Sequence, residues 1–336
     1  MTDFRPTIAL FAGDPAGIGH ELVAKVLAAN DALPVARIRV IAHQPSLDDA
    51  ARATGVTLAI PRAASAREAA DAPVAALDWD GAHAPAFARG VASAANGAFM
   101  LSALSLALDL QRRGDVDAVC FAPLNKAALR AAGMAQEDEL RWFADVLDYH
   151  GPCGEFNVLE NLWTSRVTSH VALKDVAGLL TPDRVAGAIA LLDDGLRRAG
   201  VAVPRIGVCG LNPHNGDNGN FGREELDVIA PGIALAASRG HRADGPYPAD
   251  TIFVRAKAGA FDGVVTMYHD QGQIAMKLMG FERGVTVHGG LPVPITTPAH
   301  GTAYDIAGHG RANPQALINA LSIAARMGAG ARRASA

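Results

Sequence analysis

Apolar runs that suit buried strands alternate along the chain with longer stretches of helical periodicity. Strands that alternate with helices in this way predict α/β layering around a largely parallel sheet. An alanine-rich segment, residues 60–85, is expected at the periphery, and the small, basic tail 328–336 is expected to fray. The strand-like runs are 7–12, 37–42, 116–121, 166–173, 205–211, 263–268 and 284–287, and the helical stretches are 21–29, 92–112, 182–199, 223–238 and 314–327.

Composition limits the classes of function that need to be considered. The chain has 336 residues, which corresponds to about two domains or one large α/β unit. Half of its residues are hydrophobic (50%) and 19% are charged, which excludes global disorder. The formal net charge of −4 argues against nucleic acid as a partner, because Lys and Arg are few and scattered.

The cysteines and the apolar segments indicate the compartment. Cys120, Cys153 and Cys209 are an odd number and form no CxxC motif, which argues against a disulfide framework and favours the reducing cytoplasm. No secretory leader is recognisable at the N-terminus. The most apolar stretch, residues 97–110, is too short to span a bilayer, so no membrane association is expected.

A glycine-rich loop, residues 13–19 (GDPAGIG), follows the first strand-like run and precedes a helical stretch. This context suits a phosphate-cradling turn. The loop matches neither GxGxxG nor a Walker A motif, however. A tight strand-to-helix turn, in which Asp14 bonds local backbone amides, is the favoured alternative.

Three histidines lie within or directly after strand-like runs. His170 falls inside the run 166–173, while His214 and His269 follow the next two runs. The carboxyl ends of strands form the ligand crevice of open α/β sheets. Three imidazoles at that level could bind one divalent metal and leave positions open for substrate oxygens. They could equally be hydrogen-bonding loop residues, and the spacing alone leaves both interpretations open.

The segment His300–Gly310 (HGTAYDIAGHG) is dense in glycine and small polar residues and precedes a helical stretch. Its glycines would let the backbone approach a nucleotide closely. Asp305 could accept hydrogen bonds from two ribose hydroxyls and would repel a 2′-phosphate, which favours NAD over NADP. The alternative is a solvated loop with an aspartate cap.

Taken together, these segments resemble the 4-hydroxythreonine-4-phosphate dehydrogenase family, along nearly the whole chain and in the expected order. The chain is identified as a divergent member, distinct from the vitamin B6 enzyme itself. The motifs that carry the resemblance are residues 13–19 (GDPAGIG), 122–126 (APLNK), 170–175 (HVALKD), 211–216 (LNPHNG), 221–225 (FGREE), 245–251 (GPYPADT), 267–272 (MYHDQG) and 300–308.

The resemblance implies the isocitrate/isopropylmalate dehydrogenase-like fold, in which two α/β/α domains flank a cleft. We expect a discontinuous cofactor-side domain, residues 1–128 plus 275–336, and a metal, substrate and dimerisation domain, residues 129–274. It also implies a homodimer whose active sites use residues of both subunits, and a small-molecule substrate.

The resemblance further implies roles for individual residues. His170, His214 and His269 match metal ligands, with one contributed across the dimer interface. The expected metal is zinc, with magnesium, manganese or cobalt as alternatives. Lys277 and Asp250 match positions that contact the substrate, and Lys126 is a weaker catalytic candidate. The residues expected to bind the adenosine side of NAD are His300, Gly301, Thr302, Ala303, Asp305 and Gly308.

Four positions depart from the family pattern. Cys153 and Gly154 replace a His-Thr pair, Thr286 replaces an asparagine, and Ile295 replaces an arginine. Because arginine suits bidentate phosphate contact, these changes predict a substrate without a phosphate monoester. We therefore expect an NAD-linked dehydrogenase of a hydroxy-carboxylate or cis-dihydrodiol carboxylate, with decarboxylation where a carboxylate lies β to the new ketone.

Two sets of alternatives stay open at this point. Within the same class, the substrate could be 4-hydroxythreonine 4-phosphate or a four-carbon acid-sugar phosphate. From other classes, the chain could be a phosphate acyltransferase, which shares a related architecture, or a binding protein that has lost turnover. Metal content and NADH formation separate these classes.

Overall fold

The computed structural model describes residues 5–29 and 36–335, which divide into two compact units. Unit 1 takes in the described chain up to His150, Val285–Val287 and the chain from Leu291 onwards. Unit 2 takes in Gly151–Gly284 and His288–Gly290. A discontinuous first unit was expected, but its boundary lies after residue 150 rather than 128. Helix α4 packs against α3 and so belongs to unit 1.

The strands of unit 1 form a sheet in the order β3-β4-β2-β1-β5-β12-β11. All neighbouring pairs are parallel except β11 and β12, where Thr286 pairs with Thr297 in antiparallel register. The alanine-rich segment 60–85 supplies β3, which is an edge strand, and β4 beside it. The strands are β1 (Thr7–Phe11), β2 (Arg37–Ile41), β3 (Arg62–Ala63), β4 (Val74–Leu77), β5 (Ala118–Phe121), β11 (Val285–Gly289) and β12 (Ile295–Pro298).

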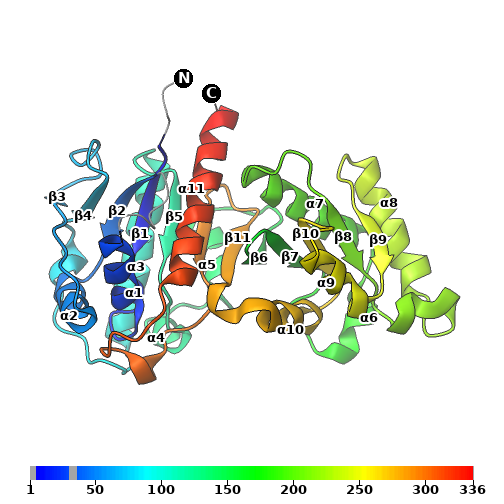
Figure 1. Ribbon diagram of the computed structural model, residues 1–336, viewed down its shortest axis with the longest axis horizontal. Coiled ribbons are helices and arrows are strands. Elements are labelled where there is room, and N and C mark those ends of the chain that lie inside the picture. The colour runs from blue at the N-terminus through cyan, green and yellow to red at the C-terminus, as the bar shows by residue number, and fades with distance from the viewer. Residues whose placement is uncertain (1–4, 30–35, 336) are drawn as a thin grey trace. The chain divides into compact units, whose positions relative to one another are not determined.

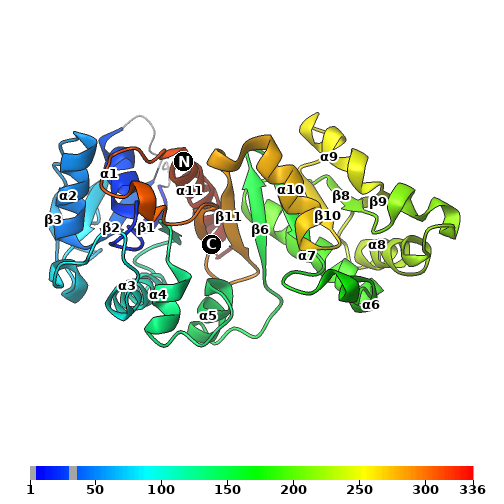
Figure 2. The ribbon, with the colours of Figure 1, turned by 90° about the horizontal axis from the view of Figure 1, so that it is seen from below.

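Helices cover both faces of this sheet, with α1, α2 and α11 on one side and α3, α4 and α5 on the other (Figure 2). The first strand and the last helix lie side by side, blue and red in Figure 1. Helix α11 reaches Ser335 instead of fraying from residue 328, because Arg332 Nε donates to Asp117 Oδ1 at 2.6 Å. The helices are α1 (Gly19–Ala28), α2 (Gln44–Thr54), α3 (Ala94–Arg112), α4 (Lys126–Ala131), α5 (Glu139–Val146) and α11 (Gln315–Ser335).

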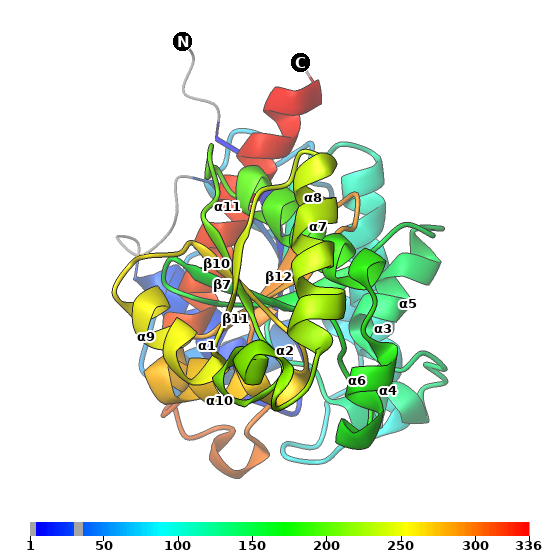
Figure 3. The ribbon, with the colours of Figure 1, turned by 90° about the vertical axis from the view of Figure 1, so that its right-hand side faces the viewer.

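The strands of unit 2 form a sheet in the order β6-β7-β10-β8-β9. Strands β6 and β7 pair antiparallel, and the remaining pairs are parallel. Helices α7 and α8 pack side by side (Figure 3), and α9 and α10 cover the opposite face (Figure 2). The elements are β6 (Gly154–Leu159), β7 (Leu162–Arg166), β8 (Ile206–Cys209), β9 (Asp244–Tyr247), β10 (Gly263–Thr266), α6 (Val176–Leu179), α7 (Pro182–Arg198), α8 (Ala230–Ser238), α9 (Ala249–Lys257) and α10 (His269–Gly280).

The predicted α/β class is confirmed, and one predicted strand is wrong. The run 166–173 was expected to form a strand that contains His170, whereas β7 spans Leu162–Arg166 and shares only Arg166 with that run. The backbone N–H and the hydroxyl of Thr168 both donate to the carbonyl of Met267, in the segment after β10. Beyond this contact the polypeptide leaves the sheet. His170 therefore lies in the segment after β7. None of the helices in residues 5–29 and 36–335 is long and apolar enough to cross a membrane.

A buried histidine lies in the first turn of α1. His20 is 3% exposed, and its Nε2 accepts a hydrogen bond from the backbone N–H of His43 at 3.3 Å. Burial and the neighbouring His43 together lower the pKa of His20 to about 3. The imidazole is therefore neutral near pH 7, and because Nε2 is an acceptor the proton is on Nδ1.

This burial predicts a loss of stability in acid. An unfolded imidazole takes up a proton below pH 6.5, whereas folded His20 does so only near pH 3. The contribution of neutral His20 to the free energy of unfolding is therefore complete above pH 6.5. It falls as the pH drops toward 3, by up to about 1.4 kcal/mol per pH unit. Between pH 7.5 and 5.0, urea unfolding of His20→Gln should lose about 2 kcal/mol less than the wild-type protein.

The exposed His83 provides the matched control, His83→Gln, which should keep the wild-type dependence of the free energy of unfolding on pH. Equal pH dependence in His20→Gln and the wild-type protein would show that His20 titrates normally in the folded state.

Candidate functional site

Two of the predicted metal ligands lie next to each other in unit 2. His269 is the first residue of α10, directly after β10, and His170 lies in the segment after β7. Because β7 and β10 are parallel neighbours, the segments that follow them leave the sheet at the same edge. The two imidazole rings have centroids 5.8 Å apart.

A carboxylate orients His269. Its Nδ1 lies 2.6 Å from Asp270 Oδ1, and its side chain is 35% exposed. A histidine that donates one ring N–H to a carboxylate keeps its other nitrogen available as a ligand, and this arrangement recurs behind metal-bound histidines. The contact with Asp270 therefore leaves Nε2 as the ring nitrogen of His269 that is open to a ligand.

The third histidine lies on a loop with an unusual backbone. His214 follows β8 and begins a run of six residues, up to Gly219, that all have positive φ; we call Pro213–Gly219 the left-handed loop. Each non-glycine residue in this conformation costs about 1–3 kcal/mol, and such strain concentrates at functional sites. The His214 side chain is exposed, and its ring centroid lies 6.3 Å from that of Phe221.

A buried carboxylate holds the start of this loop. Glu225 is 2% exposed, and its Oε1 accepts the backbone N–H groups of Leu211 and Asn212, both at 2.7 Å. Burial alone would raise the pKa of Glu225, but the hydrogen bonds from Asn212 and Leu211 hold it below its ordinary value. Glu225 is therefore an ionised structural acceptor.

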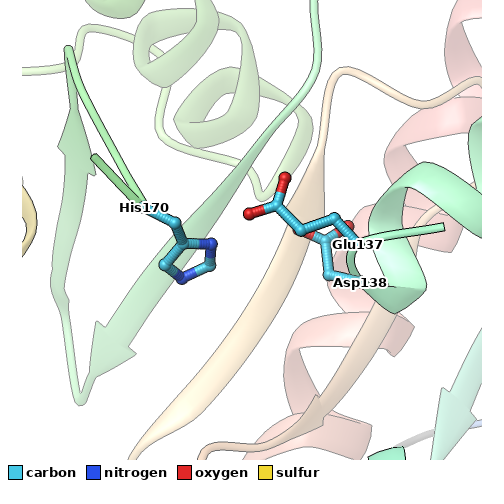
Figure 4. A group of neighbouring side chains, drawn as sticks. All are labelled: Glu137, Asp138 and His170. Atoms are coloured by element: carbon cyan, nitrogen blue, oxygen red, sulfur yellow. The ribbon is translucent and has the colours of Figure 1, made fainter. Parts of the chain in front are cut away.

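Figure 4 shows His170 on the segment that follows β7. It also shows Glu137 and Asp138, which precede α5 in unit 1, where Asp138 Oδ1 caps the helix by accepting the N–H of Arg141 at 2.8 Å. Within a single unit, one compact group of three metal-type side chains occurs among the described residues, namely Asp193, Asp194 and His241. Asp193 Oδ2 already bonds Arg197 and His241, both at 2.9 Å, so this group is an ion-pair network.

The other candidate catalytic residues lie on helices. Asp250 is exposed in the first turn of α9, and Lys277 is exposed on α10, two turns after His269. Lys126 begins α4 in unit 1, and its Nζ lies 3.7 Å from Glu139 Oε2.

The two glycine-rich segments of unit 1 are joined by hydrogen bonds. Buried Asp14 accepts the N–H of Ala16 through Oδ1 at 2.9 Å, which confirms the tight-turn interpretation. The Tyr304 hydroxyl donates to Asp14 Oδ2, and Ile18 N–H donates to Thr302 O at 3.1 Å. The loop 13–19 thus supports the segment 300–308.

The backbone of the segment 300–308 also lies close to helix α1. Gly308 has φ +85° and donates its N–H to Glu21 in α1, while Ala303 adopts a left-handed φ of 43°. Asp305 is exposed, so its carboxylate is available to a ligand. A pocket of about 110 Å³ lies beside this segment, and its lining includes Gly17, His20, Glu21, Phe87, Arg89 and Gly308.

The four altered positions lie in or beside strands, where Ile295 is buried and the other three are half-buried. Ile295 is fully buried in β12, where it pairs with Val119, so the structure shows no apolar pocket wall at this residue. A Cβ on Gly154, in β6, would lie 3.1 Å from the Leu191 side chain. Cys153 and Thr286 are half-buried, in the chain before β6 and in β11 respectively.

Sequence reasoning missed the residues that hold the histidine segments. Asp270, Gln271 and Glu225 all lie in motifs that carried the resemblance, but no role was assigned to them. Adjacency to His269 was the available signal for Asp270. No signal in the sequence pairs Glu225 with residues 211 and 212, because that contact depends on the fold.

Comparison with known proteins defines the family. The model of the family described as pyridoxal phosphate biosynthetic protein PdxA matches residues 34–324. The chain is 57% identical over 327 residues to a putative 4-hydroxythreonine-4-phosphate dehydrogenase 2 of Pseudomonas aeruginosa, covering 96% of this chain and 97% of that protein. It is 39% identical to a D-threonate 4-phosphate dehydrogenase of Cupriavidus necator, covering 96% and 97% of the two chains.

Solved structures agree. A 4-hydroxythreonine-4-phosphate dehydrogenase from Klebsiella pneumoniae superposes with a TM-score of 0.85 at 32% identity, covering 98% of this chain and 99% of that one. A terephthalate 1,2-cis-dihydrodiol dehydrogenase from Burkholderia xenovorans gives a TM-score of 0.66 at 27% identity, covering 95% and 98%. The chain therefore belongs to the PdxA family and is an enzyme, a dehydrogenase that acts on a CH–OH group.

Proposed function

We propose that this dehydrogenase uses NAD and one divalent metal to oxidise a secondary alcohol of a phosphorylated four-carbon hydroxy acid. The observation that carries the metal-dependent chemistry is the pair of imidazoles, His170 and His269, with Asp270 behind the second. The substrate class is supported by two relatives, at 57% and 39% identity, that are named for 4-hydroxythreonine 4-phosphate and D-threonate 4-phosphate.

The residues present fit a divalent metal. His170, His214 and His269 would hold it, with one ligand supplied by the partner subunit. Imidazole nitrogens suit zinc well and also bind cobalt or manganese, whereas magnesium prefers oxygen ligands. When bound, such a metal lowers the pKa of the substrate alcohol and stabilises negative charge on its oxygen.

The chain's own residues would orient the substrate and the cofactor. Lys277 and Asp250 are exposed on α10 and α9, where a cation and a carboxylate can hold polar groups of the substrate. Lys126 is the weaker candidate, because it lies near Glu139. His300, Gly301, Thr302, Ala303, Asp305 and Gly308 would bind the adenosine side of NAD, as the close backbone approach at Gly308 supports.

Phosphate in the substrate is favoured over the phosphate-free substrate predicted from the sequence. That prediction relied on the loss of an arginine at Ile295 and of a His-Thr pair at Cys153 and Gly154, and the names of the relatives at 57% and 39% identity weigh against it. A cis-dihydrodiol carboxylate is the second candidate, supported by the similarity to the terephthalate dihydrodiol enzyme at 27% identity.

We also propose a homodimer in a reducing compartment such as the cytoplasm. Ile274 and Leu278, one turn apart on α10, have exposures of 61% and 84%. Exposed apolar side chains beside the proposed metal ligands suit a subunit interface. Cys120, Cys153 and Cys209 form no disulfide bond, which supports the reducing compartment.

The metal assignment predicts that His214→Ala and His269→Ala lose most of their bound metal, because each removes one of three ligands. Metal content is measured on purified protein after dialysis against trace zinc. His150→Ala, which replaces an exposed histidine before unit 2, is the control and should bind like the wild-type protein. Wild-type metal content in both ligand variants would rule the assignment out.

The role of Asp305 predicts that NAD is used in preference to NADP. The carboxylate should bond the ribose hydroxyls and repel a 2′-phosphate, so kcat/KM for NAD should be the higher of the two. In Asp305→Asn the ratio should fall by about tenfold or more, mainly through the KM for NAD. An unchanged ratio would show that Asp305 does not contact the ribose.

The substrate class is tested with purified protein, NAD and zinc, by following NADH absorbance. We expect 4-hydroxythreonine 4-phosphate or D-threonate 4-phosphate to reach a kcat/KM above about 10⁴ M⁻¹s⁻¹, and their dephosphorylated forms to fall far below it. Preferential turnover of a cis-dihydrodiol carboxylate would select the second candidate. Metal-free acyl transfer without NADH formation would refute dehydrogenase function.

A further inference from the structure

The left-handed loop, Pro213–Gly219, needs support from outside its own backbone. His214, Asn215, Asp217 and Asn218 all adopt positive φ, and only Gly216 among the central five does so without a steric penalty. Such a conformation persists only where surrounding contacts over-determine it.

Glu225 supplies part of that support, from the π-helical turn Glu225–Ile229. Its Oε1 holds the N–H groups of Leu211 and Asn212, and its Oε2 accepts Asn212 Nδ2 at 3.0 Å. The chain closes tightly around this carboxylate: a Cβ on Gly216 would lie 2.7 Å from Oε2, and one on Gly210 would lie 3.0 Å from Oε1.

Gln271 connects the left-handed loop to the segment of His269. Its Oε1 accepts the N–H of Met267 at 2.7 Å, and its Nε2 donates to the carbonyl of Gly210 at 2.8 Å. The side-chain amide of Gln271 therefore joins Met267, which follows β10, to Gly210, which follows β8. Thr168 bonds the carbonyl of the same Met267 at 2.8 Å, which ties in the segment of His170.

We propose that Glu225 and Gln271 are positioning residues that fix the backbone segments of His214 and His269, and thereby set the affinity of the metal sites to which these two histidines contribute. The inference rests on the proposed function, because it takes these histidines as ligands. Neither side chain contacts the metal or substrate in this account. Both act through the backbone on either side of the histidines, so their loss should loosen ligand geometry more than it loosens the fold.

The test measures zinc affinity of the full-length protein by competition with a chromophoric chelator, with the folded fraction followed by circular dichroism. Glu225→Gln puts an N–H group against the Asn212 amide, and Gln271→Met removes both hydrogen bonds at similar size. Each variant should lose about ten- to a hundredfold in zinc affinity, the usual effect of removing a contact behind the ligands.

The matched control is Asp227→Asn, because Asp227 lies on the same π-helical turn and its exposed carboxylate bonds the side chain of Arg223. It should bind zinc within about twofold of the wild-type protein. Hydrogen exchange of the metal-free protein should speed up in residues 211–219 in Glu225→Gln but not in the control.

His214→Ala separates the possible failures. If it weakens zinc binding while Glu225→Gln and Gln271→Met bind normally, positioning is refuted and the metal site stands. If His214→Ala binds zinc normally, both the metal assignment and the positioning role fail. If Glu225→Gln does not fold, Gln271→Met decides on the same tenfold threshold. A lower melting temperature with unchanged zinc affinity would assign both residues a structural role only.

Discussion

The parallel pairing of β10 with β7 on one side and β8 on the other is the constraint on which the site depends. Parallel neighbours end at the same edge of a sheet, so residues far apart in the chain leave it together. His170 and His269 follow two of these strands, and their rings lie 5.8 Å apart. His214 follows the third, on a backbone that would be costly without Glu225. The strand order thus determines which histidines lie at this edge, and the hydrogen bonds of Asp270 and Glu225 hold the segments that carry His269 and His214.

Buried carboxylates shape the loops of both units. Asp14 accepts hydrogen bonds from a backbone N–H, the Asn96 amide and the Tyr304 hydroxyl, and so joins the loop 13–19 to the segment 300–308. Glu225 has the same function for the start of the left-handed loop in unit 2. A buried carboxylate that accepts several hydrogen bonds fixes the backbone around it, since leaving it unpaired would cost several kcal/mol. In this chain, the segment 300–308 and the left-handed loop are each anchored by one such group.

Much of the architecture could be predicted from the sequence, because buried parallel strands are continuous apolar runs. The strand before His269 is of this kind, and its position was predicted to within two residues. Strand β6 was missed because Glu155 and Asn157 interrupt its apolar pattern. The strand predicted at 166–173 was wrong, because β7 spans Leu162–Arg166 and the strand-like residues after Arg166 instead bond around Met267. The full burial of Ile295 within β12 depends on packing that the sequence does not display, and its role toward the substrate stays a prediction.

We propose three imidazoles per metal, two from one subunit and one from its partner, supplied by His170, His214 and His269. X-ray absorption at the zinc edge, on purified full-length protein loaded with one equivalent of zinc per chain, tests this most directly. We predict three nitrogen scatterers at about 2.0–2.1 Å with the outer-ring signal of imidazole, and the loss of one such scatterer in His214→Ala. A spectrum dominated by oxygen ligands, or one unchanged in His214→Ala, would contradict the account.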